Sequence, residues 1–353
     1  MRWEPGPGAH LLLGSNGAGK TSLLESIYLI ATTKSFRTPR LEECCRRERT
    51  DFALNATVEG EARASLELGW SSTGRWRKLN GSSVEVARYL EVLPVVTWSS
   101  FDLKVVDGAP RDRRRFLDQG IVSRSPAAIE VLSRYRQALE QKRELLRRRD
   151  VTTTLDLKAW NELLASSSAE LIARRCRFLE ELESTLLSTL AKSTLELPAI
   201  GLRYRPSPNL EDPTAESIMG EFDRLLGREL EEGRVLSGPH RDEVEITWNG
   251  VEASKIASAG EKKLLGLLLS AARGRLLSDA GRRPIVLLDD IDAELDRRRL
   301  RAVWPLFSFA SQIVATSCHD AILETLPEAR FWRLRKGAIG CSEISSQEPS
   351  TSI

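Results

Sequence analysis

The residues best suited to chemistry lie near the start of the chain, in a glycine-rich stretch that matches the pattern GxxxxGK[ST]. The apolar run Leu11–Leu13 precedes it, and an amphipathic stretch with helical spacing follows it. In such a loop, glycines let backbone N–H groups turn inward around phosphates, and the N-terminus of the next helix adds positive potential. The pattern therefore predicts a nucleotide-phosphate site made by Gly14, Ser15, Asn16, Gly17, Ala18, Gly19, Lys20, Thr21 and Ser22.

Two residues of this loop and two distant aspartates have separate expected roles. Lys20 would neutralise charge on the β- and γ-phosphates, and the hydroxyl of Thr21 would ligate Mg²⁺. Asp289 and Asp290 directly follow the apolar run Ile285–Leu288. A carboxylate at the end of a buried strand suits Mg²⁺ ligation through water, which we assign to Asp289. We assign polarisation of the attacking water to Asp290, whose short reach predicts slow turnover.

Three shorter segments indicate a function only when their order along the chain is considered. Ser258 and Gly260 precede a very apolar helical stretch, and taken alone Ser258 is only a helix N-cap. Asp296 ends the segment Ala293-Glu294-Leu295-Asp296, and His319 follows a third apolar run. This is the order found in ABC-type ATPases. The similarity implies that Ser258, Gly260 and Asp296 contact nucleotide, that His319 is a catalytic switch histidine, and that two ATP molecules lie between two copies.

The apolar patterns indicate an α/β fold that positions these residues. Leu11–Leu13, Ile285–Leu288 and Ile313–Thr316 have the composition of buried parallel strands. Apolar residues alternate between positions 52 and 70, and Asn80-Gly81 marks a hairpin turn, so an antiparallel part is also expected.

The spacing becomes helical from about residue 109 to residue 197. It predicts either a long antiparallel helical pair joined near residues 150–154 or an ordinary helical subdomain, and both alternatives are open. At roughly 150 residues per domain, 353 residues predict about two domains. We expect an ATPase lobe I of residues 1–105 and 280–353. Residues 106–279 would form a helical lobe II that includes the Ser258 helix start. The polar residues 342–353 are expected to be disordered.

Composition excludes several classes of protein. Apolar residues make up 41% and charged residues 29%, as in globular chains rather than disordered ones. No apolar run approaches the ~18 residues of a membrane span, and no secretory signal is visible, so we expect a cytoplasmic protein without a membrane partner. The five cysteines form no CxxC pair, which favours free thiols in a reducing compartment. The net charge of +2 indicates no nucleic-acid partner by itself.

Further segments carry a more specific pattern. They are Ser22–Arg37, Gly108–Pro110 with Arg113–Asp118, Leu236–Glu243, and Leu287–Asp290 with Glu294–Asp296. In these segments, and across nearly its whole length, the chain resembles the RecF family of bacterial recombination-repair ATPases. The resemblance implies an ABC/SMC-type ATPase head with a helical second lobe and an ATP-dependent homodimer. It also implies binding of double-stranded DNA and gap junctions, and action with RecO and RecR to load recombinase. A slow, DNA-stimulated hydrolysis of ATP would serve as a switch rather than a motor.

The chain departs from the family pattern in three places. It opens at the turn Pro5–Gly8, where the family usually has a preceding strand. Either the start codon is set downstream of the true one or the head is truncated, and we favour the first explanation because every later element is intact. The helix start continues as Glu261-Lys262-Lys263 instead of glutamines and an arginine, and Glu261 would repel a γ-phosphate unless Lys262 or Lys263 compensates its charge. The segment Trp98–Asp102 replaces the family's usual turn, and no Q-loop glutamine can be assigned.

Local basic clusters are the candidates for DNA contact. Residues 134–149 carry seven basic and two acidic side chains, and a second cluster precedes them. A solvated helix face is the ordinary explanation of such a cluster, and the resemblance raises the weight of DNA binding. The pattern favours contacts to the phosphate backbone over base stacking, without sequence specificity. The candidates are Arg111, Arg113, Arg114, Arg115, Arg143, Arg147, Arg148 and Arg149.

Two other functions share part of these features. The ATP-binding subunit of a transporter has the same motif order, although the helical insertion and the Gly238–Glu243 segment argue against it. An ATP-insensitive DNA-repair scaffold would keep the fold without nucleotide-dependent dimerisation. Loss of dimerisation in Lys20→Ala would separate the ATP-gated dimer from this scaffold.

Overall fold

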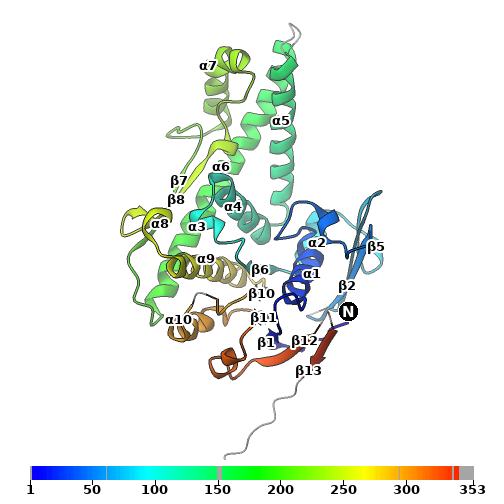
Figure 1. The fold of residues 1–353 in the computed structure, drawn as a ribbon. Helices are drawn as coiled ribbons and strands as arrows, with labels where there is room; N and C mark the ends of the chain where they lie inside the picture. Colours follow the sequence, from blue (N-terminus) through cyan, green and yellow to red (C-terminus); the bar gives the residue numbers. More distant parts are fainter. Residues whose placement is uncertain (1, 61, 149–152, 294, 336–337, 342–353) are drawn as a thin grey trace, which may run out of the picture. The chain divides into compact units, whose positions relative to one another are not determined.

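The computed structural model describes residues 2–60, 62–148, 153–293, 295–335 and 338–341 (Figure 1). The chain divides into two compact units. Unit 1 consists of residues 1–102, 193–195 and 263–353, and unit 2 consists of residues 103–192 and 196–262. Among the described residues, no helix is both long and apolar enough to cross a membrane.

Unit 1 is built on two sheets. Its elements are β1 (Gly8–Leu13), α1 (Lys20–Thr32), η1 (Leu41–Cys44), β2 (Phe52–Val58), β3 (Ala64–Ser71), β4 (Gly74–Leu79), β5 (Ser82–Ser83), α2 (Val86–Val92), β6 (Val95–Trp98), β10 (Ile285–Leu288), α10 (Arg297–Val303), η3 (Trp304–Phe307), β11 (Gln312–Ser317), η4 (Asp320–Glu324), β12 (Arg330–Arg335) and β13 (Ala338–Cys341).

The larger sheet has the strand order β13-β12-β1-β11-β10-β6 (Figure 1). β6, β10, β11, β1 and β12 pair in parallel, and β13 is antiparallel to β12. The three expected parallel strands are therefore confirmed as β1, β10 and β11. Because they are neighbours, the carboxyl ends of β1, β11 and β10 meet at one edge of the sheet.

The second sheet is antiparallel, as expected, with the order β2-β3-β4-β5. The predicted turn joins β4 to β5, and both of its residues have positive φ, 52° at Asn80 and 79° at Gly81. An Asn-Gly pair tolerates this left-handed backbone, which matches the twist of a two-residue hairpin.

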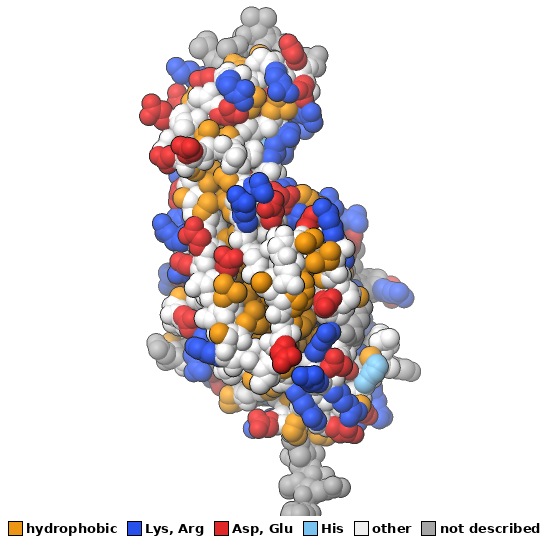
Figure 2. Space-filling view, turned by 90° about the vertical axis from the view of Figure 1, so that its left-hand side faces the viewer, with side chains coloured by type: hydrophobic (Ala, Val, Ile, Leu, Met, Phe, Trp, Pro, Cys, Tyr) orange, Lys and Arg blue, Asp and Glu red, His pale blue; other side chains and the backbone are white. Residues whose placement is uncertain are grey.

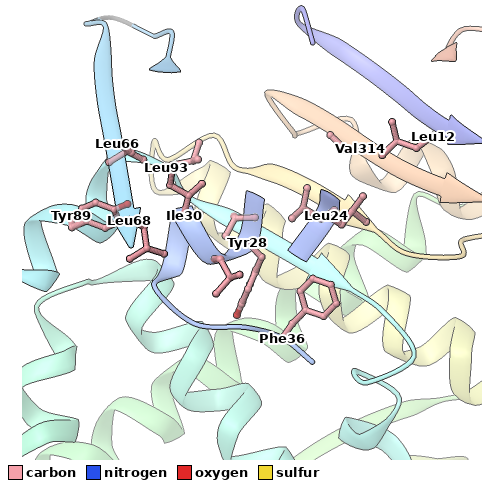
Figure 3. Packing of buried hydrophobic residues seen from close by; sticks show 14 of the residues in the cluster. Leu12, Leu24, Tyr28, Ile30, Phe36, Leu66, Leu68, Tyr89, Leu93 and Val314 are labelled. Carbon is pink, nitrogen blue, oxygen red and sulfur yellow. The ribbon is translucent and has the colours of Figure 1, made fainter. Parts of the chain in front are cut away.

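An apolar cluster of buried side chains joins both sheets of unit 1 to α1 and α2. Figure 3 shows Leu24, Tyr28 and Ile30 of α1 together with Leu12 and Val314 of the parallel sheet. Leu66 and Leu68 of the antiparallel sheet, and Tyr89 of α2, belong to the same cluster. α1 therefore has apolar partners from both sheets, which fixes the helix that follows the glycine-rich loop.

Unit 2 combines helices with a three-stranded antiparallel sheet of order β7-β8-β9. Its elements are α3 (Lys104–Asp107), α4 (Pro110–Arg124), α5 (Ala128–Arg148), α6 (Thr153–Ala191), β7 (Ile200–Arg205), α7 (Ala215–Glu232), η2 (Pro239–Arg241), β8 (Glu243–Trp248), β9 (Val251–Glu252) and α8 (Ala253–Ile256).

The expected helical pair corresponds to α5 and α6, which pack against each other (Figure 1). The expected junction lies mainly outside the described residues. Leu139 of α5 and Leu164 of α6 share an apolar cluster with Ile218 and Phe222 of α7. Because α7 covers the pair, this part of unit 2 is a packed helical subdomain rather than a two-helix arm.

Helix α9 (Ala259–Asp279) begins in unit 2 and continues in unit 1 from Lys263. This differs from the expected boundary at residue 279, which assigned the whole helix to the helical lobe. The difference has a packing cause. A Cβ atom at Gly266 would lie 3.0 Å from Nε1 of Trp98, and one at Gly274 would lie 2.4 Å from Cζ of Phe309. The helix thus lies directly against aromatic side chains of unit 1.

Candidate functional site

The glycine-rich loop joins β1 to α1 in a conformation that depends on its glycines. Gly17 and Gly19 have φ of 79° and 102°, in the left-handed region that favours glycine. A Cβ atom at Gly14 would lie 2.6 Å from the carbonyl oxygen of Leu334, so a larger residue would displace the backbone. The pattern identified in the sequence therefore has the backbone that a phosphate-binding loop requires.

Lys20 lies at the start of α1 with its ammonium against this loop. Nζ donates to the carbonyl oxygens of Gly14 at 2.8 Å and Ser15 at 3.3 Å, and the side chain is buried. The positive charge is thus held beside backbone carbonyls at the point where the sequence predicts phosphate.

Thr21 and Asp289 meet although 268 positions separate them in the chain. The Thr21 hydroxyl lies 3.0 Å from each carboxylate oxygen of Asp289, and the Thr316 hydroxyl donates to Oδ1 of Asp289 at 2.8 Å. Burial raises the pKa of the Asp289 carboxyl, while the hydrogen bond from Thr316 acts in the opposite direction. A hydroxyl and a buried carboxylate are hard oxygen ligands, and this pair fits Mg²⁺.

Asp290 differs from Asp289 in its backbone conformation and in its exposure to solvent. It has a φ of 45°, is exposed, and its N–H donates to the Thr316 hydroxyl at 2.8 Å. A left-handed non-glycine residue is strained and persists only where the surroundings hold it. The two aspartates therefore differ in environment, with Asp289 buried beside Thr21 and Asp290 open to solvent.

The two remaining candidates in unit 1 have their own local contacts. Asp296 caps α10 by accepting from the N–H of Arg299 at 2.8 Å. His319 has a 63% exposed side chain, with Nδ1 3.2 Å from Sγ of Cys318 and 4.0 Å from Oδ2 of Asp292. These contacts leave the proposed nucleotide roles of Asp296 and His319 as predictions.

The start of α9 is a capping box. The N–H and the hydroxyl of Ser258 both donate to Oε2 of Glu261 at 2.8 Å, and the N–H of Glu261 reaches the Ser258 hydroxyl at 3.3 Å. Gly260 lies between them in the first turn. Glu261, which stands where the family has a glutamine, thus stabilises the start of α9, because its carboxylate accepts hydrogen bonds from Ser258.

The basic clusters are more internally paired than the sequence indicates. Arg113 is paired with Glu243 at 2.8 Å and is only 11% exposed, and Arg114 donates to the carbonyl of Asp242. Lys142, one of the seven basic residues counted in 134–149, is fully buried against Glu229. Both expectations of solvent-facing charge are therefore corrected, because these cations hold unit 2 together.

The other arginines are exposed to different degrees. Arg111 and Arg115 are exposed, whereas Arg143, Arg147 and Arg148 lie within 4.0 Å of glutamates on the same helix. Arg149 lies outside the described residues. On the face in Figure 2, basic and acidic side chains are interspersed rather than gathered in one basic strip.

Two residues of this region were not identified from the sequence. Thr316 bonds both aspartates, and its position at the end of a predicted parallel strand was the available signal. Lys263 was considered only as a cation that could compensate Glu261. Its hydrogen bond to the carbonyl of Asp290, at 2.8 Å, had no signal because a helix-face lysine is usually solvated. The Trp98–Asp102 segment forms a turn in which Asp102 accepts from the N–H of Ser99 at 2.8 Å.

Comparison with known proteins gives a consistent result. Residues 2–336 match the model of the RecF/RecN/SMC N-terminal domain. The chain is 31% identical over 338 residues to the DNA replication and repair protein RecF of Prosthecochloris aestuarii, covering 92% of this chain and 91% of that protein. It is 34% identical over 337 residues to RecF of Frankia alni, with 90% and 89% covered.

Solved structures show a similar fold. A structure of the recombination mediator protein RecF with ATP, in the RecFOR pathway, has a TM-score of 0.86 at 23% identity and covers 97% of this chain and 94% of that one. The Smc head domain of Pyrococcus furiosus has a TM-score of 0.50 at 17% identity, with 95% and 89% covered. The expected class is confirmed: an ABC/SMC-type P-loop ATPase head with a mixed sheet and additional helices.

Proposed function

Since the chain belongs to the RecF family of the RecF/RecN/SMC proteins, we propose that it is a DNA replication and repair protein that binds ATP with Mg²⁺ and engages DNA as an ATP-gated dimer. Its relatives carry the name DNA replication and repair protein, and a fold relative was solved with ATP. The chain is 31% and 34% identical to two RecF proteins over 92% and 90% of its length, which argues against the ATP-binding subunit of a transporter.

One observation carries the ATP part of this proposal. The Thr21 hydroxyl and the Asp289 carboxylate meet at 3.0 Å beside the glycine-rich loop, although they come from opposite ends of the chain. The carboxyl ends of β1 and β10 bring them together at one edge of the parallel sheet, with β11 between the two strands. A hydroxyl and a carboxylate side by side next to a phosphate-binding loop are the arrangement that Mg²⁺-nucleotide binding requires.

We assign each candidate residue a role in the binding and hydrolysis of ATP. The Gly14–Ser22 loop and the Lys20 ammonium bind the phosphates, and Thr21 and Asp289 hold Mg²⁺, which when bound screens phosphate charge. Asp290 orients and polarises the attacking water, and His319 lies after β11 to assist. Ser258, Gly260 and Asp296 contact the nucleotide held by a second copy. Hydrolysis is slow and resets DNA binding.

The DNA and partner parts rest on family membership. We assign phosphate-backbone contacts to Arg111, Arg115, Arg143, Arg147 and Arg148, which are exposed or partly exposed, and to Arg149, which lies outside the described residues. Arg113 and Arg114 are left out because unit 2 uses their charge internally. The DNA is double-stranded or a gap junction, the partners are RecO and RecR, and the setting is recombinase loading in the cytoplasm.

The test is DNA binding in the presence and absence of ATP and Mg²⁺. Fluorescence anisotropy with a labelled gapped duplex is measured for wild type, Lys20→Ala and the control Lys78→Ala. Lys78 is an exposed lysine of β4 in the same unit, so its removal changes charge without touching the loop. We expect ATP to tighten binding at least about tenfold in wild type and control. Lys20→Ala should lose this response, because the phosphate charge is no longer neutralised.

The opposite outcome has a definite meaning. If DNA binding is equally tight with and without ATP in all three proteins, the chain is an ATP-insensitive repair scaffold and the ATP-gated proposal is wrong. If Lys20→Ala keeps the full ATP response, the glycine-rich loop is not the nucleotide site.

A further inference from the structure

Lys263 is a buried cation directed at the segment that contains Asp290. Its side chain is 3% exposed. Nζ donates to the carbonyl oxygen of Asp290 at 2.8 Å and to the carbonyl oxygen of Ala293, and it lies 4.6 Å from the ring centroid of Trp98. Burying an ammonium group is costly unless its hydrogen bonds are made. A lysine of an ordinary helix face would instead extend its charge into water.

The two carbonyls that accept from Lys263 belong to one turn. The N–H of Ala293 also donates to the carbonyl of Asp290, at 3.1 Å, so this turn closes on the oxygen that Lys263 binds. From the other side, the N–H of Asp290 donates to Thr316. The strained left-handed backbone of Asp290 is therefore held at both of its peptide groups, by β11 on one side and by Lys263 on the other.

The ring beneath Lys263 belongs to the same structure. The carbonyl oxygen of Trp98 accepts from the N–H of Asp289 at 2.9 Å, and β6 pairs with β10 so that Trp98 lies beside Leu288. Lys263 thus contacts the strand end that holds Asp289 through a ring, and the turn that follows Asp290 through hydrogen bonds. A displacement of the Lys263 side chain would therefore change the position of the Asp290 backbone.

Lys263 also belongs to the helix that begins at the capping box. It follows Ser258 by five residues, about 7.5 Å along the axis of α9. Because a helix of hydrogen-bonded turns is stiff, a displacement of its first turn is passed to Lys263 and from there to the Asp290 turn. The helix start therefore has a direct mechanical connection to the candidate water-polarising carboxylate.

We propose that Lys263 is a positioning residue for ATP hydrolysis, which fixes the Asp290 carboxylate and couples its position to the start of α9. This inference rests on the proposed ATPase function, and goes beyond it by naming the group that links the two motifs. Lys263 does not touch nucleotide; it acts through the Asp290 turn.

The test compares hydrolysis with nucleotide binding in four proteins: wild type, Lys263→Met, Asp290→Asn and the double variant. Steady-state hydrolysis gives kcat and KM, and a fluorescent ATP analogue gives Kd. We expect Lys263→Met to lower kcat about ten- to hundredfold with Kd changed less than about threefold, as for a misplaced catalytic group. Asp290→Asn should lower kcat as well. Adding Lys263→Met to it should lower kcat no further, because both changes disable the same carboxylate.

A matched control removes a cation elsewhere on the same helix. Arg275 is half-exposed and pairs with Asp279, so Arg275→Met should keep the wild-type kcat. If Lys263→Met does not fold, as judged by its near-ultraviolet circular dichroism, Lys263→Gln replaces it, since glutamine keeps one donor and adds no buried charge.

The outcomes separate the inference from the function on which it rests. Absence of ATP hydrolysis in wild type would refute the proposed ATPase activity itself. A wild type that hydrolyses ATP, with a Lys263 variant within twofold of its kcat, would overturn the role of Lys263 alone. Multiplicative losses in the double variant would show that Lys263 acts on folding or on another group, and would also overturn it.

Discussion

At the scale of residues, the polar side chains of this protein divide into those that face a candidate ligand and those that hold the fold. His240 and Arg241, in the Leu236–Glu243 segment, illustrate the second class. Arg241 donates to the carbonyl of Val235 at 2.9 Å. The N–H of His240 donates to the Tyr135 hydroxyl at 2.8 Å, which lies 2.9 Å from Nδ1 of His240. The hydroxyl keeps one proton that it can donate to Nδ1, which suits a neutral imidazole.

His240 predicts a loss of stability in mild acid. Burial, with the charges of Arg143 and Arg241, lowers the pKa of His240 from 6.5 to about 3. Above pH 6.5 the imidazole is neutral in both states. Below pH 6.5, His240 is protonated in the unfolded chain but stays neutral in the folded chain, because its folded pKa is about 3. The free energy of unfolding should therefore fall as the pH falls from 6.5 toward 3, by about 2 kcal/mol at pH 5 from this group.

The measurement is urea unfolding of wild type and His240→Gln at pH 7.5 and pH 5. Wild type should lose more stability between these values than the variant, because glutamine has no proton to gain. His10, whose pKa is also lowered by burial, is present in both proteins and cancels in the comparison. Equal pH dependence in the two proteins would contradict the assignment of a neutral, structural His240.

At the scale of elements, buried charge fixes how helices and strands of unit 2 are arranged. The guanidinium of Arg175 on α6 donates to Asp118 of α4 at 2.8 Å and to Asp242 at 2.7 Å. A second pair joins α5 to α7, where Nζ of Lys142 lies 2.7 Å from Glu229 and 4.2 Å from the ring centroid of Phe222. These pairs specify one register between long helices that apolar contacts alone would leave free to slide.

The Lys142–Glu229 pair predicts an asymmetric response to substitution. Both side chains are fully buried, so Glu229→Gln leaves an uncompensated ammonium group and should cost about 3–5 kcal/mol of unfolding free energy. The double variant Lys142→Met with Glu229→Leu should recover most of that loss, because no charge is left buried. Chemical denaturation measures both.

The control for this prediction is an exposed pair on α7. Glu221 and Arg224 lie at 2.7 Å with Arg224 mostly exposed, and Glu221→Gln should change stability by less than about 1 kcal/mol. Equal losses for Glu221→Gln and Glu229→Gln would show that burial of the Lys142 pair has no special weight.

At the scale of the whole molecule, the chain offers one half of an ATP site at its glycine-rich loop and one candidate partner surface at the start of α9. In the proposed dimer, each copy supplies Ser258, Gly260 and Asp296 to the nucleotide of the other. The capping box at Ser258 stabilises that helix start before a partner arrives. The carboxylate of Glu261 accepts a hydrogen bond from the Ser258 hydroxyl of its own chain.

This arrangement predicts that blocking hydrolysis traps the dimer. Asp290→Asn keeps Lys20, Thr21 and Asp289 and should still bind ATP with Mg²⁺. Light scattering with ATP should therefore give twice the mass of one chain for Asp290→Asn over hours, whereas wild type should return to a monomer as ATP is consumed. A monomeric Asp290→Asn protein at saturating ATP would contradict the ATP-gated dimer.

Features that depend on neighbouring residues could be predicted from the amino-acid sequence. The glycine-rich loop, the Asn80-Gly81 hairpin and the apolar runs of β1, β10 and β11 follow from local backbone preference and from the composition of buried strands. The expected roles of Thr21 and Asp289 also followed from sequence, because a loop pattern and a strand end each have a short local signal.

Features that depend on contacts between distant parts of the chain could not be predicted in this way. Charge in a sequence does not reveal burial, so Arg113 and Lys142 had the same pattern as solvated cations until packing placed them against Glu243 and Glu229. No local pattern predicts the contact between Lys263 and the Asp290 turn, because that turn lies 27 residues further along the chain. Strand order, which brings Thr316 between the two aspartates, is set by long-range pairing energy that no local pattern encodes.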